Sequence, residues 1–84
     1  MAAKAPDFFV WTTSGELGEA VLVARKAAGL TQAALAARSG VTARFVYSLE
    51  RGKGTLRNDK TLAVLRALGL FPLIVPLEAL GVLR

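Results

Sequence analysis

The stretch GLTQAALAARSGVTARFVYSLERGK, residues 29–53, decides the fold because it predicts two short helices in close succession. Thr31 and Thr42 each precede a run of helix-forming residues. Threonine is a favoured N-cap because its hydroxyl accepts a hydrogen bond from a free amide of the first turn. We therefore expect one helix at about 32–39 and a second at about 43–51.

The connection between these helices, residues 40–42, is so short that the helices must cross steeply, at about 90–120°. Such contact requires a small residue on the first helix and a residue that can adopt a positive φ at the turn. Ala36 and Gly40 meet these two requirements, and Val46 and Leu49 supply the inward face of the second helix. The pattern is that of a helix-turn-helix.

Two further helices are expected around this pair. The first begins at about residue 15 and ends at about residue 28, with Ser14 as its N-cap. The last follows the pair and is capped by Asn58 or Asp59. Its leucines recur at helical spacing: Leu62, Leu65 and Leu68. The three predicted parts of the chain are an N-terminal arm (1–13), a helical domain (14–69) and a C-terminal tail (70–84).

The tail changes character, because the apolar run 70–77 contains two prolines and is typical of an edge strand. Pro72 and Pro76 have no backbone N–H group, so one edge of the strand lacks two hydrogen-bond donors. The other edge, with Leu73 and Val75, keeps all of its donors. A single strand is unstable in water, so we expect two copies to pair antiparallel in a homodimer. The predicted interface residues are Phe71, Leu73, Ile74, Val75 and Leu77.

The N-terminal arm contains four β-forming residues, 8–11, without a helical period. They could add a strand to the tail sheet, cover that sheet, bind a partner, or be buried in the core of the same chain. The sequence leaves these alternatives open.

The charge distribution favours a nucleic-acid partner. The net charge is +5, and nine of the eleven basic residues lie between Arg25 and Arg66, with only Glu50 and Asp59 to offset them. The absence of cysteine and histidine argues against disulfides, thiolate metal sites and the commonest general base. We therefore expect no enzyme activity, metal or cofactor. Neither end resembles a secretory signal or a membrane span, so a cytoplasmic protein is expected.

With these features the chain resembles the phage-repressor, or Xre/Cro-type, DNA-binding domains. The resemblance is carried by the Thr-Gln pair 31–32, Ala36, Gly40, Val46 and the segment 49–53, and it extends from about Leu17 to Leu70. The later part, a helix followed by an apolar strand, is similar to HipB-type antitoxins. That similarity implies an antitoxin function with a HipA-like serine/threonine kinase as the partner toxin.

The DNA contacts follow from the docking geometry of this fold, in which the second helix of the pair enters the major groove. Arg44 is the strongest candidate for base readout, since its guanidinium matches the O6/N7 pair of guanine; the alternative is a phosphate contact. The candidates for base readout are Ala43, Arg44, Tyr47 and Ser48. The candidates for phosphate contact are Thr31, Gln32, Thr42, Arg51, Lys53 and Arg57.

Arg25 and Glu50 occupy positions at which phage-repressor domains pair an arginine of the first helix with a glutamate at the end of the recognition helix. An unpaired carboxylate in a basic surface would repel phosphate, so this structural ion pair is expected here.

The sequence therefore predicts an all-α domain of four to five helices with a short C-terminal β-strand that pairs across a dimer. The expected function is sequence-specific repression through a palindromic operator, as an autoregulating antitoxin. The alternatives are a solitary Xre-type regulator without a toxin and a protein-interaction module that does not bind DNA.

Overall fold

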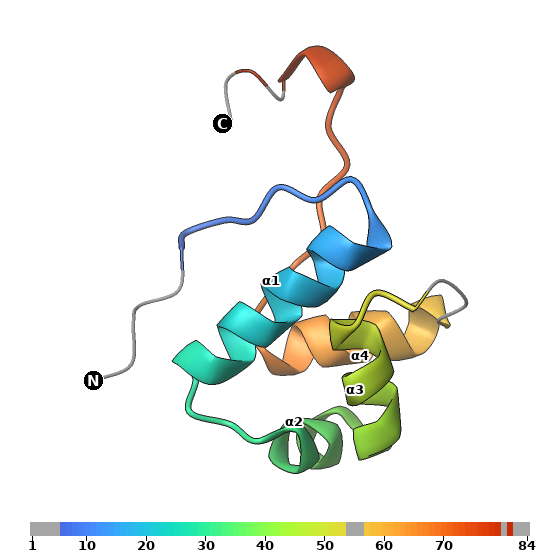
Figure 1. The fold of residues 1–84 in the computed structure, drawn as a ribbon. Helices are drawn as coiled ribbons and strands as arrows, with labels where there is room; N and C mark the ends of the chain where they lie inside the picture. The colour runs from blue at the N-terminus through green and yellow to red at the C-terminus, as the bar shows by residue number, and fades with distance from the viewer. Residues whose placement is uncertain (1–5, 54–56, 80, 82–84) are drawn as a thin grey trace.

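The computed structural model describes residues 6–53, 57–79 and 81. Its elements are α1 (Ser14–Ala27), α2 (Gln32–Ser39), α3 (Ala43–Glu50), α4 (Asn58–Ala67) and a single 3-10 turn, η1 (Leu77–Ala79). The described part of the chain is thus all-α, with α2 and α3 at one end of the molecule (Figure 1). The outer parts of the predicted arm and tail (1–5, 80 and 82–84) lie outside the described residues.

The caps of the helix-turn-helix are those expected from the sequence. The hydroxyl of Thr31 accepts from the amide of Ala34, and that of Thr42 accepts from the amide of Phe45. Gly40 adopts φ 73° and ends α2, a backbone conformation that glycine alone adopts without strain. The predicted bounds of α2 are confirmed, and α3 ends one residue earlier than predicted.

The two outer helices begin differently from the prediction. The N-cap of α1 is Thr13, whose hydroxyl accepts from the amide of Glu16, so Ser14 is already the first helical residue. The N-cap of α4 is Arg57, and no side-chain hydrogen bond caps this end. Both predicted caps were wrong because each helix begins one residue or more earlier than expected, so that Ser14, Asn58 and Asp59 already lie inside the first turn, where Asp59 pairs with Arg57 at 3.0 Å.

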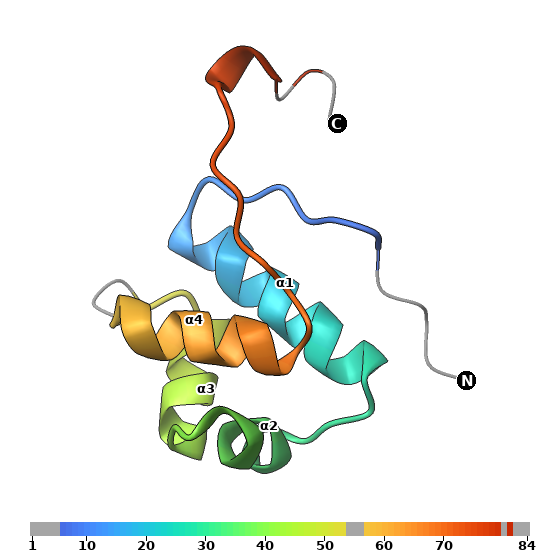
Figure 2. The ribbon, with the colours of Figure 1, turned by 180° about the vertical axis from the view of Figure 1, so that it is seen from behind.

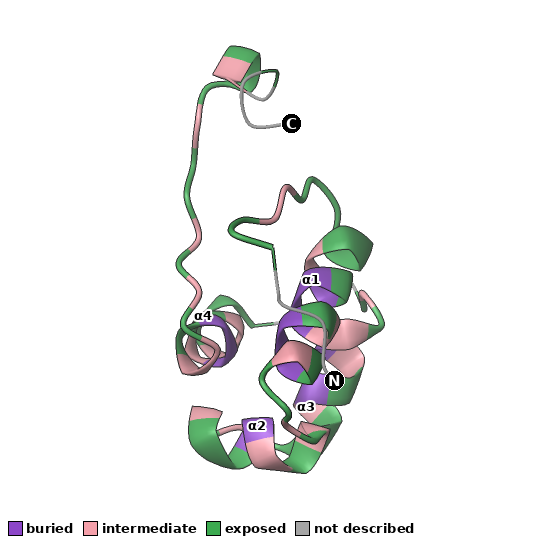
Figure 3. Ribbon diagram, turned by 90° about the vertical axis from the view of Figure 1, so that its left-hand side faces the viewer, coloured by how far each residue is buried: buried purple, intermediate pink, exposed green. Residues whose placement is uncertain are grey.

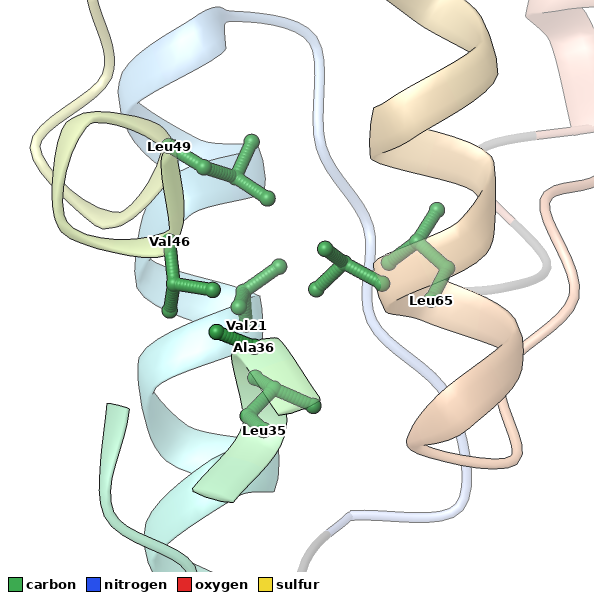
Figure 4. Close-up of a cluster of buried hydrophobic side chains, with 7 residues drawn as sticks. Val21, Leu35, Ala36, Val46, Leu49 and Leu65 are labelled. Atoms are coloured by element: carbon green, nitrogen blue, oxygen red, sulfur yellow. The ribbon is translucent and has the colours of Figure 1, made fainter. Parts of the chain in front are cut away.

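The core lies where the four helices meet, and its largest fully buried side chains come from every one of them (Figure 4). They are Val21, Leu35, Val46, Leu49 and Val64. The prediction of Val46 and Leu49 as the inward face of α3 is confirmed. In α4 the buried pair is Val64 and Leu65, whereas Leu62 is exposed.

A close approach of α1 to α3 fixes the position of α3. A Cβ atom at Gly18 would lie 2.3 Å from the carbonyl oxygen of Leu49, which is closer than real Cβ contacts allow. The backbones of the two helices therefore meet directly at this point, and only glycine permits it.

The predicted C-terminal strand is not present: within the part of the chain that the structure describes, no residue is in a strand. The tail instead extends from α4 past α1 toward the arm (Figure 2), and much of it is exposed (Figure 3). A strand needs a neighbour for its backbone hydrogen bonds, and the single chain does not place one beside the tail. Among the described helices, none is both long and apolar enough to cross a membrane.

Candidate nucleic-acid interface

The outer face of α3 carries the predicted readout residues. Ala43, Arg44 and Tyr47 are exposed and Ser48 is half-buried, because the opposite side of the helix is committed to the core through Val46 and Leu49. Because a helix has 3.6 residues per turn, these four residues lie on the face opposite Val46 and Leu49. The structure thus brings the four readout candidates together on one accessible surface.

The side chain of Tyr47 contacts Arg51, one of the candidates for phosphate contact. The guanidinium of Arg51 lies over the Tyr47 ring, 5.3 Å from its centroid, a cation–π arrangement. The contact limits the rotamers of both side chains and leaves the edge of the guanidinium free to donate hydrogen bonds. Tyr47 and Arg51 therefore form one surface feature at the end of α3.

A buried cluster anchors the same end of α3 to the rest of the domain. Arg25 donates from Nε to Glu50 Oε2 at 2.6 Å and from Nη2 to Glu50 Oε1 at 3.1 Å, so the ion pair is bidentate. The Arg25 and Glu50 side chains are only 11% and 5% exposed. Arg25 also donates to the carbonyl oxygen of Leu30 at 2.9 Å. The structure thus joins the two residues that the sequence paired.

Gln32 is the third member of this cluster, and the positions of the residues along the sequence did not show its contact with Glu50. Its amide nitrogen donates to Glu50 Oε1 at 3.0 Å, so the start of α2 is tied to the end of α3. The amide group has two protons, and the second remains available for a phosphate contact. The network of Arg25, Glu50 and Gln32 therefore ties α1 and the start of α2 to the end of α3, and it limits the orientation of the Gln32 amide.

The remaining phosphate candidates lie at the starts of α2, α3 and α4 and directly after α3. Thr31 and Thr42 are exposed, and their hydroxyl oxygens accept cap hydrogen bonds, which leaves the hydroxyl protons free to donate. Lys53 is exposed after the helix. Arg57 is also exposed, and its ion pair with Asp59 lies in solvent, where such pairs are weak and can be exchanged for a phosphate.

Sequence reasoning missed Lys60 in this region. Its ammonium group lies 5.9 Å from the centroid of the Phe45 ring, which is half-buried beside α4. The signal that could have identified it is its place in the basic segment, in the first turn of α4. The contact adds a positive charge beside the start of α3.

The predicted dimer residues lie apart from this surface, on the tail beyond α4. Four of them are exposed and Val75 is half-buried: Phe71, Leu73, Ile74, Val75 and Leu77. The tail leads away from the end of the molecule formed by α2 and α3 (Figure 3).

Comparisons with known proteins agree with this arrangement. The fold is similar to that of HipB in a HipB–O4 20mer complex, with a TM-score of 0.77 and 20% identity over 83% of this chain and 99% of that chain. A chain of a HipA-HipB-O2-O3 complex gives a TM-score of 0.76 at the same identity and coverage. In sequence, an uncharacterized HTH-type transcriptional regulator of Sinorhizobium fredii is 42% identical over 57 residues, 68% of this chain and 75% of that protein.

A model of the helix-turn-helix family matches residues 23–73, which is more than half of the chain and includes α2, α3 and α4. Together with the relative from Sinorhizobium fredii and the arrangement of α2 and α3, this match shows that the chain belongs to the helix-turn-helix family, in its Xre/Cro type.

Proposed function

We propose that this protein is a transcriptional repressor that binds a palindromic DNA operator as a homodimer, with α3 in the major groove. The observation that carries the proposal is the division of α3 into a buried apolar face and an accessible face that bears Arg44 and the Tyr47–Arg51 pair. A helix anchored in this way presents side chains to base edges without losing its position.

The contacts divide into two groups. Arg44, near the N-terminus of α3, donates to the O6/N7 pair of a guanine, and Ala43, Tyr47 and Ser48 contact neighbouring base edges. The phosphate contacts come from side chains on either side of this helix: Thr31, Gln32, Thr42, Arg51, Lys53 and Arg57. The N-terminus of α2 adds its free backbone amides and its dipole to these contacts.

Dimerisation follows from the operator symmetry and from the tail. Two α3 helices related by a two-fold axis read two half-sites. The tail residues Phe71, Leu73, Ile74, Val75 and Leu77, which are apolar and exposed or half-buried, supply the contact. The edge opposite the prolines can pair with its symmetry mate. The predicted strand would then form only in the dimer.

The test is to select bound duplexes from a random library and to measure the affinity for a selected duplex as salt is raised. We expect a selected palindrome and a steep loss of affinity with salt, because each phosphate contact releases counterions. Arg44→Glu should abolish binding. Lys26→Glu, which makes the same charge change on the exposed side of α1, should change it little. Absence of binding at low salt would instead favour a protein-interaction module.

A second proposal concerns the partner. The solved structures that share this fold include a chain of a HipA-HipB-O2-O3 complex, and the match covers 99% of that chain. This likeness favours an antitoxin that autoregulates its operon and binds a HipA-like kinase, and the protein itself has no catalytic role. Co-expression with the neighbouring reading frame tests it: a kinase that copurifies supports the antitoxin, and the lack of such a neighbour supports a solitary cytoplasmic regulator.

A further inference from the structure

An apolar groove lies between the N-terminal arm and the tail. Residues 7–12 form one wall, residues 69–75 form the other, and Leu17, Ala20 and Leu65 lie between them. The volume of the groove is about 590 Å³, within the range of about 300–1,000 Å³ of pockets that enclose compact apolar ligands. It can therefore accept the side chains of one extended segment, but not a folded domain. We call it the arm–tail groove.

The arm side of the groove is fixed to α1. Thr12 donates from its amide and from its hydroxyl to Glu16 Oε1, at 2.7 and 2.8 Å. Phe9 and Val10 are half-buried, and both line a second hollow against α1. Between described residues, no backbone hydrogen bond connects the arm to the tail, and the two extend as separate segments (Figure 3). The groove is therefore open between two extended walls.

We propose that the occupant of the arm–tail groove is the tail, residues 70–77, of a second copy of this chain. The inference rests on the homodimer of the proposed function and adds the arm to its interface. A two-fold axis between the tails gives the order arm, partner tail, tail, partner arm. In this order each tail lies between the other copy's arm and tail, so both grooves are filled by the same operation.

The prolines define the role of the arm in this arrangement. Pro72 and Pro76 lack amide protons, so the tail edge that bears them cannot continue a regular ladder. The tails pair through the opposite edge, where Leu73 and Val75 keep their donors. The proline edge is left facing the partner's arm, and that arm covers it with side chains.

The exposed apolar area favours a contribution of the arm to the dimer. Phe71, Leu73, Ile74 and Leu77 are 85%, 73%, 99% and 80% exposed, and such side chains offer together about 400 Å² per protomer. These four side chains thus offer about 800 Å² of apolar surface in a dimer, which is less than the roughly 1,200 Å² at the lower end of stable interfaces.

Adding the aromatic residues of the arm changes this comparison. Phe8 and Trp11 are 55% and 43% exposed in the groove wall. Their addition brings the area to about 1,200 Å² in total, the lower end of stable interfaces. The two aromatic residues of the arm therefore add about half as much apolar area again as the four tail residues offer.

Trp11 reports this contact directly, because it is the only tryptophan of the chain. Acrylamide quenching of its fluorescence would be measured on the full chain at concentrations above and below the dimer dissociation constant determined by sedimentation. We expect the quenching constant to fall by about half or more in the dimer, since the partner tail covers much of the 43% exposed surface. Equal quenching of monomer and dimer would overturn the inference while leaving a tail-mediated dimer intact.

Two matched variants separate the arm from the tail. Phe8→Glu places a charge in the groove and should raise the dimer dissociation constant on the order of tenfold or more. Leu62→Glu makes the same kind of change at an exposed residue of α4 outside the groove and should leave dimerisation unchanged. Equal effects of the two variants would overturn the inference. A wild-type chain that remains monomeric at high concentration would overturn the proposed dimer as well.

Discussion

The ion pair of Arg25 and Glu50 gives the prediction whose magnitude follows most directly from the structure. Both side chains are at least about nine-tenths buried, and they share two hydrogen bonds. Removing one partner of a buried pair leaves a desolvated charge, which costs about 3–5 kcal/mol. We expect about 3 kcal/mol for Glu50→Gln or Arg25→Met, the lower end of this range, because Arg25 keeps the carbonyl of Leu30 and Glu50 keeps Gln32.

This loss is large for so small a domain. A chain of this length has a free energy of unfolding of about 4–12 kcal/mol, so either single variant should unfold at a clearly lower urea concentration. The double variant should lose about 4 kcal/mol of unfolding free energy, which is less than the sum of the two single losses. The reason is that the second substitution removes the charge that the first left buried and unpaired.

The measurement is urea unfolding followed by far-ultraviolet circular dichroism for all four proteins. The control is the exposed pair of Arg57 and Asp59, whose side chains are 67% and 65% exposed. Arg57→Met should cost less than about 1 kcal/mol, since solvent screens this pair. Additive losses in the Arg25 and Glu50 cycle, or single losses no larger than that of Arg57→Met, would refute the reasoning.

Three further outcomes are expected. Arg44→Ala should cost about 1–3 kcal/mol on the selected operator and relax the preference at one base pair, whereas Lys53→Ala should weaken all duplexes alike and reduce the salt slope by about one unit; competition binding against random DNA distinguishes them. Gly18→Ala should destabilise the domain by about 1–3 kcal/mol or more in urea unfolding, because its Cβ would strike the backbone of α3, whereas Gly15→Ala, with only a 3.8 Å contact, should be tolerated. Val75→Pro should give a monomer in sedimentation with its helical circular dichroism intact, and a persistent dimer would move the interface away from the tail.

The parts of the fold that the sequence predicted are those set by local chemistry. Thr31, Gly40 and Thr42 specify α2 and the start of α3 through caps and a left-handed turn, and each acts within four residues of its own position. The inward face of α3 was predictable because Val46 and Leu49, three positions apart, fall on the same side of a helix.

The parts that the sequence missed depend on contacts between distant segments. The burial of Val64 instead of Leu62 is set by how α4 rotates against the other helices. The contact of Gly18 with α3 joins residues about thirty positions apart, and nothing near Gly18 marks it. For Gln32, the family resemblance implied a phosphate contact and often a brace to the recognition helix, but its particular partner, Glu50, depends on how α2 crosses α3.

The tail shows a different limit. Its alternation of prolines and apolar residues predicts a strand, but a strand forms only when a second strand supplies hydrogen bonds. In the described single chain, no second strand lies beside the tail, and residues 71–76 have no regular secondary structure.

Titration of the isotopically labelled protein with a selected operator duplex tests the central claim most directly, because each backbone amide reports its own surroundings. If α3 reads the major groove, the largest chemical-shift changes should fall on residues 31–33, 42–48 and 51–53. The amides of the arm and the tail, residues 6–12 and 70–77, should change little. Changes confined to the arm and tail, with α3 unaffected, would contradict the account.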